Sequence, residues 1–328
     1  MQNAIWNTGF LERIATGDPA AVEIFVQPGF SDFELSAIIQ VLQTANDVCN
    51  MDRFSWHVTS DQPGLITSSS ELLVRAEPTI GDEYLKDCLI VVGGQGVSAS
   101  GWINRVRAMQ RLKRPAILLS DAATKYIKTS ATLSGPVTTH WRDIGILHET
   151  GDYPTLTNHL VENNNGILTC AGQSHTQEIV IGLLSAFLNP QDCAELSNTL
   201  ILENVRGFQR DQPAGLSKSP NFFEKRLQNA IALMEGNVET PLRIAFLAGE
   251  IGVSTRQLER LFMFYLGKSP AKFYKHIRLK HAQALIVDTQ MPLIDVALAS
   301  GFSTSSSLAN SYRQEFGTTP NKARNRKN

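Results

Sequence analysis

The sequence has few cysteines, and none of them forms a close pair. Cys49, Cys88, Cys170 and Cys193 are far apart and give no CxxC spacing, which argues against a metal site or a disulfide scaffold and favours a reducing cytosol. No apolar run approaches the roughly 20 residues of a membrane-spanning helix. The N-terminus lacks the basic and then apolar pattern of a signal peptide. We therefore expect a cytoplasmic protein without a cofactor or metal, in which residues 1–20 form a partly ordered tail.

The sequence also has little net charge, but its charge is unevenly distributed. Its 328 residues suggest two domains, and 42% hydrophobic with 19% charged residues is an ordinary globular composition. Residues 221–328 hold 15 Lys and Arg against 8 Asp and Glu, a balance of +7, whereas residues 1–220 have a balance of −8. A basic third attached to an acidic remainder is typical of a DNA-binding domain joined to another kind of module.

Residues 241–320 contain one motif twice. Each copy has an apolar-periodic helix, a Gly-x-Ser break (252–254 and 301–303) and a second helix that starts at a serine N-cap. A Gly-x-x-Pro sequence (267–270 and 317–320) ends each copy. The offset is 49 residues up to the turn and 50 after it, so the second copy has one extra turn residue. This pattern predicts two helix-turn-helix motifs, whose second helices enter a DNA major groove. The expected core positions are Leu247, Leu258, Phe262, Val296, Phe302, Leu308 and Tyr312.

The same region resembles the DNA-binding domain of the AraC/XylS family of bacterial transcription regulators, from about Phe222 to Arg324. Its most specific segment is IDVALASGFSTSSSLANSYRQEFGTTP (294–320), and a helix over 271–287 joins the two motifs. An arginine is common in the family where Asn310 stands, so the second helix is expected to act more through phosphate contacts and shape. The alternative is an all-helical interaction domain whose glycines merely end helices. Separately, Arg256 and Arg260 are either base-reading residues or plain surface charges. The base-reading positions that the resemblance implies are Arg256, Glu259, Arg260, Ser305, Ser306, Ala309, Asn310 and Arg313.

Strands and helices alternate before this region. Apolar strands are expected at 21–29, 54–60, 88–96 and 115–120, helices at 31–49, 103–112, from about 122 and at 174–188, and hairpins at 64–80 and 158–172. This order predicts an α/β doubly wound, flavodoxin-like sandwich over residues 21–205. Residues 206–220 are rich in Gly, Pro, Gln and Ser and are expected to form a linker to an all-α domain at 221–328.

This first domain resembles the DJ-1/PfpI (class I glutamine amidotransferase-like) domain, most of all the version fused to AraC-type domains in GlxA-like regulators. The resemblance spans about Ala21 to Pro190. The segments that carry it are QPGFSDFEL (27–35), VVGGQGV (91–97), TTHW (138–141) and CAGQSHTQEIVIGLL (170–184). It implies a domain that senses a small metabolite and dimerises.

Enzymes of that superfamily carry a nucleophilic cysteine on the turn between a strand such as 115–120 and the following helix. The family pattern places Asp121 at this elbow, with a register uncertain by about one residue, and its neighbours Ser120, Ala122 and Ala123 are not thiols either. Because the thiolate is the nucleophile, we predict a non-catalytic domain. Cys88 and Cys170 begin or end apolar strands and are expected in the core.

Other side chains are candidates for an effector site at the elbow. Glu34 is interpreted either as a carboxylate facing the elbow or as a solvated first-turn residue of its helix. Residues 93–96 either cradle an anion or merely turn tightly, and His140 beside an aromatic is usually a core residue. Two carboxylates with aromatic neighbours, Phe30, Phe33 or Trp141, would suit an ammonium group. The candidate ligand-binding residues are Glu34, Asp121, Gln95, His140 and Trp141.

Three functions follow from these patterns. We expect a ligand-responsive transcription regulator, most often an activator, that binds promoter DNA as a homodimer, contacts RNA polymerase and responds to an amino acid, a betaine or another amine. The first alternative is a DJ-1/PfpI-type enzyme of the amidase, glyoxalase or chaperone kind with a fused helical domain, which the missing thiol disfavours. The second is a DNA-binding protein whose N-terminal domain only dimerises.

Overall fold

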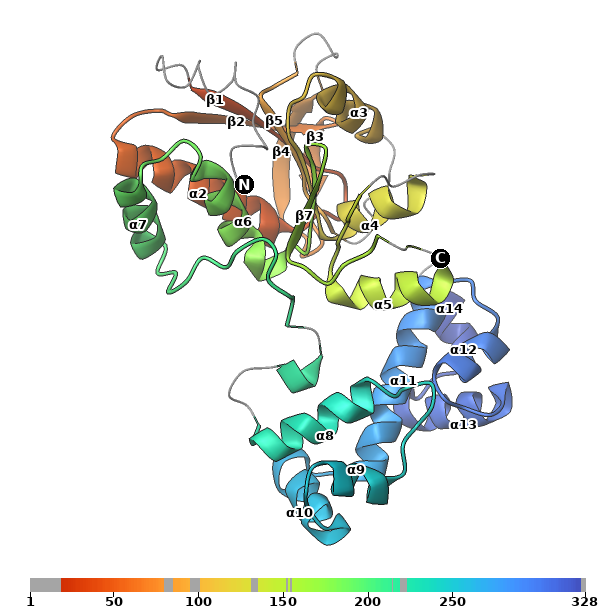
Figure 1. Ribbon diagram of the computed structural model, residues 1–328. Helices are drawn as coiled ribbons and strands as arrows, with labels where there is room; N and C mark the ends of the chain where they lie inside the picture. Colours follow the sequence, from red (N-terminus) through yellow and green to blue (C-terminus); the bar gives the residue numbers. More distant parts are fainter. Residues whose placement is uncertain are drawn as a thin grey trace. The chain divides into compact units, whose positions relative to one another are not determined.

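The structure, a computed structural model, describes residues 19–79, 85–94, 101–130, 135–151, 153, 155–213, 215–218 and 223–325. The chain divides into two compact units (Figure 1). The first consists of Met1–Ile144 and Pro154–Gln212, and the second of Gly145–Tyr153 and Pro213–Asn328. None of the described helices is both long enough and apolar enough to cross a membrane.

The strands described in the first unit form a single eight-stranded sheet, in the order β3-β4-β2-β1-β5-β6-β8-β7. The six inner strands pair in parallel, and an antiparallel hairpin stands at each edge, β3 with β4 and β7 with β8. Both hairpins were predicted from the sequence. The strands are β1 (Ala20–Phe25), β2 (Phe54–Ser60), β3 (Gly64–Thr67), β4 (Leu73–Pro78), β5 (Cys88–Val91), β6 (Ala116–Leu119), β7 (Val161–Asn164) and β8 (Ile167–Cys170).

Helices cover both faces of this sheet, so the fold is the doubly wound α/β sandwich that the sequence predicted. On one face α2 packs beside α6 and α7, and on the other α3 and α4 pack against the central strands. The bounds are α2 (Asp32–Cys49), α3 (Ile103–Arg111), α4 (Ser120–Thr129), α6 (Thr176–Leu184) and α7 (Pro190–Thr199), with the 3-10 helix η3 (Gln173–His175). Helix α5 (Trp141–Thr150) begins in the first unit and continues in the segment assigned to the second.

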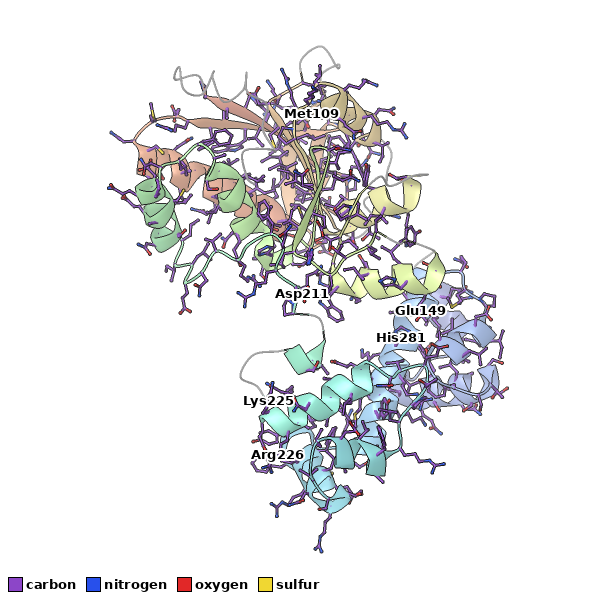
Figure 2. All side chains as sticks on the ribbon, viewed as in Figure 1. Met109, Glu149, Asp211, Lys225, Arg226 and His281 are labelled. Carbon is purple, nitrogen blue, oxygen red and sulfur yellow. The ribbon has the colours of Figure 1, made fainter. Side chains whose placement is uncertain are left out.

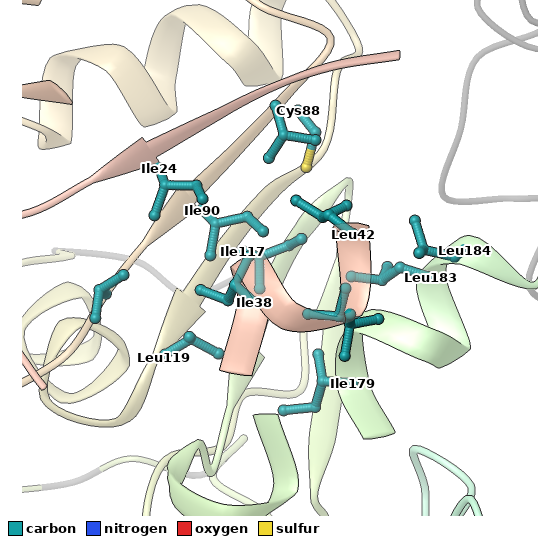
Figure 3. Packing of buried hydrophobic residues seen from close by; sticks show 14 of the residues in the cluster. Ile24, Ile38, Leu42, Cys88, Ile90, Ile117, Leu119, Ile179, Leu183 and Leu184 are labelled. Atoms are coloured by element: carbon teal, nitrogen blue, oxygen red, sulfur yellow. The ribbon is translucent and has the colours of Figure 1, made fainter. Parts of the chain in front are cut away.

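Alternate residues of the central strands enter the two cores. In β5, Cys88 and Ile90 pack with α2 and α6, whereas Leu89 and Val91 belong to the core on the α3 side. Figure 3 shows the first of these cores, with Ile38 and Leu42 of α2 among the strand isoleucines. A strand buried on both faces needs apolar residues at every position, which is why its sequence is an uninterrupted apolar run.

Residues 206–212, which we call the strap, lie along the first unit and do not form a free linker. The amides of Leu160 and Val161 donate hydrogen bonds to the carbonyls of Arg210 and Phe208 at 2.9 and 3.0 Å. The Arg206 guanidinium pairs with the buried carboxylate of Glu178 in α6. The expected linker at 206–220 therefore contains a fixed first half, because a backbone alongside a strand edge satisfies its own polar groups there.

The second unit is all-helical and has two cores. One lies among α8, α9, α10 and the start of α11, and the other among the rest of α11, α12 and α13. The long helix α11 therefore joins two helix-turn-helix halves (Figure 1). The bounds are α8 (Lys225–Glu235), α9 (Ile244–Glu250), α10 (Thr255–Leu266), α11 (Pro270–Asp288), α12 (Leu293–Ala299), α13 (Ser305–Phe316) and α14 (Pro320–Asn325), with the 3-10 helix η4 (Leu216–Lys218).

Candidate functional site

The two turns of the second unit have the same hydrogen bonds. Gly252 and Gly301 both adopt φ of +70°, a conformation that costs glycine little and other residues much. In each turn the glycine and the residue after it donate to carbonyls three and five residues back. These bonds join Gly252 to Gly249 (3.0 Å), Val253 to Ala248 (3.0 Å), Gly301 to Leu298 (2.8 Å) and Phe302 to Ala297 (2.7 Å).

The recognition helices α10 and α13 begin differently. Ser254 accepts from the Gln257 amide, and Gln257 reaches back to the Ser254 amide, so α10 has a complete capping box. Helix α13 begins one residue later than predicted, because its N-cap is Thr304, which accepts from the Ser307 amide, and not Ser303. The extra turn residue of the second copy therefore shifts the cap. Gly267 and Gly317 end the two helices in the left-handed conformation, as predicted.

The predicted base-reading side chains of α10 lie on its open face. Arg256, Glu259 and Arg260 are exposed, while Leu258 and Phe262 on the opposite face are buried. Within the described part of the chain, no ion pair or side-chain hydrogen bond engages the two arginines. Long, unpaired cations on the open face of a recognition helix are available to phosphates and to guanine edges.

The side chains on the corresponding face of α13 are shorter and carry less charge than those of α10. Ser306, Asn310 and Arg313 are exposed, and Ser305 and Ala309 are half-buried. Hydroxyl and methyl groups reach base edges less far than a guanidinium does, so this helix has less capacity for direct readout.

Figure 2 shows Lys225 and Arg226 at the start of α8, which is a different helix from the two recognition helices.

Arg278 of α11 fixes the second turn. Its guanidinium donates to the Ser300 carbonyl at 2.9 Å and to the Gly301 carbonyl, and it lies 4.3 Å from the centre of the Phe302 ring. A cation over an aromatic face combined with two carbonyl acceptors holds the turn in one position. All seven predicted core positions of the two motifs are buried, so the hydrophobic pattern was interpreted correctly.

The elbow of the first unit is Ser120, one residue before the predicted Asp121. Ser120 follows β6 with φ of +43°, a strained conformation for a residue with a side chain, and it begins α4. Asp121 lies in the first turn of α4 and is half-buried. The strained residue is thus one position before Asp121, within the one-residue uncertainty of the family register, and the elbow carries a hydroxyl.

Glu34 lies beneath the elbow and is not a solvated first-turn residue. It is fully buried, and its Oε1 accepts from Ser120 Oγ at 2.5 Å and from the Gln173 amide at 2.7 Å. Burial raises the pKa of Glu34 above the usual carboxyl value, and the charge of Asp121 raises it further. The hydrogen bonds from Ser120 and Gln173 lower the pKa, but burial outweighs them. The first of the two interpretations of Glu34, a carboxyl facing the elbow, is the one that the structure supports.

Glycines let the backbone approach the elbow closely. A Cβ on Gly172 would collide with Ser120 Oγ and Glu34 Oε1, and one on Gly93 would come within 2.9 Å of the Asp121 amide nitrogen. Gly172 and the Gln173 amide were not singled out from the sequence. The glycine in CAGQ was the available signal, because such a residue often marks a close backbone approach.

The other predicted ligand residues are only partly brought together. Trp141 is 39% exposed, and its ring lies 5.6 Å from that of the half-buried His140. His140 is thus not a fully buried core residue, and desolvation lowers its pKa. Phe30 is completely buried in the core, so it does not offer the aromatic face that was predicted, whereas Phe33 is 53% exposed. Gln95 lies outside the described residues.

None of the four cysteines is the elbow residue, although Cys170 pairs with Leu119 directly before the elbow. Cys88 and Cys170 are buried on strands, as predicted, and burial raises the pKa of both thiols. Cys49 and Cys193 are half-buried at the end of α2 and in α7, with pKa values also raised chiefly by desolvation. A raised thiol pKa disfavours the reactive thiolate.

Known proteins resemble this chain in both units. A family described as helix-turn-helix domain matches residues 247–326. The HTH-type transcriptional regulator GbdR of Pseudomonas aeruginosa is 27% identical over 306 residues, which cover 92% of this chain and 83% of GbdR. The HTH-type transcriptional regulator CdhR of the same species is 28% identical over 300 residues, 90% of this chain and 89% of CdhR.

A solved structure shares the fold of the first unit. The VC2308 protein superposes with a TM-score of 0.50 at 14% identity, covering 58% of this chain and all of that one. The relatives match the chain across both units, and the helix-turn-helix match falls on the second. The chain is thus a DNA-binding transcription regulator, similar over most of its length to HTH-type regulators such as GbdR and CdhR, with a doubly wound α/β domain ahead of its tandem helix-turn-helix domain.

Proposed function

We propose that this regulator responds to a small effector bound at the elbow, and that it activates transcription as a homodimer in contact with RNA polymerase. The observation that carries the DNA-binding part is the pair of exposed recognition helices, one with Arg256 and Arg260 unpaired among the described residues. A promoter-binding regulator acts where the chromosome is, which in a bacterium is the cytoplasm.

Asp121 is the proposed counter-ion of the effector. Glu34 is a poorer candidate for a counter-ion, because burial raises its pKa and favours the protonated form and its Oε1 is occupied by Ser120 and Gln173, although its Oε2 has no hydrogen-bond partner among the described residues. Asp121 is half-buried in the first turn of α4, and its charge acts on Glu34. Trp141, two residues after the Thr139 that contacts the Ser120 carbonyl, has an exposed aromatic ring. A carboxylate and an aromatic ring suit a cationic nitrogen. We therefore propose an amino acid, a betaine or another small amine as the effector.

The absence of a thiol at the elbow supports a sensor and not an enzyme. Ser120 Oγ donates its hydrogen bond to Glu34, a carboxyl whose pKa is raised by burial. A nucleophilic serine needs a base that is poised to take its proton and is itself oriented by a third group. Detectable amidase or glyoxalase turnover by the purified chain, lost on Ser120→Ala, would restore the enzyme alternative.

The effector proposal is tested by calorimetry with the full chain and three probes, glycine betaine, L-arginine and putrescine. We expect one of them to bind, and Asp121→Asn to weaken that binding at least tenfold. The matched control is Asp47→Asn, an exposed aspartate on α2, which should leave the affinity unchanged. Equal affinity in wild type and Asp121→Asn would refute the role of Asp121. Binding of none of the three would refute the amine class as represented by these probes.

The homodimer is tested by sedimentation of the full chain at micromolar concentration. A dimer without DNA is expected. A monomer that pairs only on DNA would contradict dimerisation by the N-terminal domain and leave the tandem helix-turn-helix assignment intact.

A further inference from the structure

Gln212 is a buried amide whose side chain is hydrogen bonded at both ends. It is 2% exposed. Its Oε1 accepts from the Trp141 amide at 2.8 Å, and its Nε2 donates to the carbonyls of Thr139 at 2.7 Å and His159 at 3.0 Å. Its own backbone amide donates to Asn158 at 2.9 Å. A buried amide with this many partners has one orientation, because leaving any partner unsatisfied is costly.

Thr139 connects this amide to the elbow. Its Oγ1 donates to the Ser120 carbonyl at 3.0 Å and lies 2.6 Å from Thr124 Oγ1. The carbonyl that it contacts belongs to the residue with the strained φ. A change in the backbone of Ser120 therefore reaches Gln212 through one intervening residue, by hydrogen bonds and not through the apolar core.

Gln212 is also where the chain leaves the first unit, since Pro213 is the first residue of the segment assigned to the second. Proline fixes its own φ and restricts the residue before it to extended conformations. The direction in which the backbone leaves the first unit thus depends on how Gln212 is held. The same side chain accepts from Trp141, the first residue of α5.

From this arrangement we infer that Gln212 is a positioning residue that transmits the state of the elbow to the DNA-binding domain. The route runs from the Ser120 carbonyl to Thr139, to the Gln212 side chain and to the backbone at Pro213. The inference rests on the proposed effector site in one respect: a bound effector would start the change at Ser120. The coupling itself is a property of the protein without effector.

A double-mutant cycle on the full chain tests the coupling without any ligand. Ser120→Gly perturbs the elbow in two ways: it relaxes the strained φ, because glycine adopts it freely, and it removes the hydroxyl that donates to Glu34. The dissociation constant is measured at one salt concentration for a DNA site that the wild-type chain selects from a random pool. We expect Ser120→Gly to change it by roughly two- to thirtyfold, the range of mutations that modulate coupling between sites. In the Gln212→Ala background, Ser120→Gly should cause no further change.

Two further variants check this result, one that breaks the route at a second point and one that serves as a control. Thr139→Val keeps the shape of the side chain but removes the donor to Ser120, so it should abolish the effect of Ser120→Gly as Gln212→Ala does, even if Gln212→Ala folds poorly. Gln40→Ala, an exposed glutamine on α2, should leave that effect intact.

The same fold-change in all backgrounds would overturn the inference, and so would no change on Ser120→Gly in the wild-type background. Because the cycle uses no effector, failure of the amine proposal does not affect its outcome.

Discussion

Ser120 Oγ lies 2.5 Å from Glu34 Oε1, so the strained elbow residue and the first helix of the sandwich are joined by one buried hydrogen bond. The same hydroxyl lies 3.2 Å from the Ala171 carbonyl, in the segment between β8 and η3. Three segments far apart in the sequence therefore meet at one side chain. This contact makes Ser120 important for stability as well as for the proposed effector site.

Replacing Ser120 by alanine should destabilise the first unit. The variant keeps the strained φ and removes a donor from the buried Glu34 carboxyl, so we expect a loss of about 1–3 kcal/mol. Urea denaturation followed by fluorescence measures it. Ser69→Ala, at an exposed serine, should stay within about 0.5 kcal/mol of wild type. Equal stability of the two variants would show that the Ser120–Glu34 hydrogen bond contributes nothing.

Glu178 should make the stability of the first unit depend on acid pH. Desolvation raises its pKa, but the His175 ring, whose Nδ1 lies 3.4 Å from Glu178 Oε1, and the hydrogen bonds from Arg206 outweigh this and hold the pKa at about 2. A pKa below the unfolded value means that the unfolded state binds the proton more tightly, so the stabilisation is present above about pH 4.5 and is lost as the pH falls towards 2.

The difference in unfolding free energy between wild type and Glu178→Gln should therefore shrink between about pH 5 and pH 2. Urea denaturation of both proteins at a series of pH values measures this difference. Other carboxylates contribute equally to both proteins, so their contributions cancel. A difference that does not change with pH would contradict the lowered pKa of Glu178.

The two turn glycines provide a matched pair of substitutions. Gly252→Ala and Gly301→Ala place a side chain at the same φ of +70°, which should cost each roughly 1–2 kcal/mol. Nothing lies within 4 Å of a Cβ at Gly252, whereas a Cβ at Gly301 would collide with the Val238 carbonyl and the Pro241 ring. Gly301→Ala should therefore lower the melting temperature of the second unit clearly more, as calorimetry can measure. Equal shifts in melting temperature would mean that the segment with Val238 and Pro241 moves away from the new Cβ without a loss of stability.

Arg256 and Arg260 should contribute to sequence readout. A good bidentate contact to a base is worth about 1–3 kcal/mol of discrimination, so Arg256→Ala or Arg260→Ala should cost that much on the selected site and little on random DNA. Fluorescence anisotropy on both DNAs measures the difference. Arg226→Ala on α8 is the control and should change specificity little. Equal losses on both DNAs would show that the two arginines contact phosphate alone.

Local sequence determined most of the second unit. Glycine, proline and capping residues define helix ends wherever they occur, and the apolar period defines the buried face, so the turns, the core positions and the exposed face of α10 could be predicted residue by residue. The missed detail was the cap of α13. Ser303 and Thr304 are both good N-caps, and the local pattern does not distinguish between them.

The elbow and the strap depended on tertiary structure. The sequence alone determined that strands and helices alternate and that no cysteine follows β6, because patterns and residue types are local properties. It did not determine which residue bends at the elbow, since Ser120 adopts a positive φ only under the constraint of β6 on one side and of Glu34 and Gly172 on the other. Likewise, the polar residues of the strap have the composition of a linker. They become fixed because Leu160 and the start of β7, Glu178, and the segment at 138–141 supply hydrogen-bond partners that lie far away in the sequence.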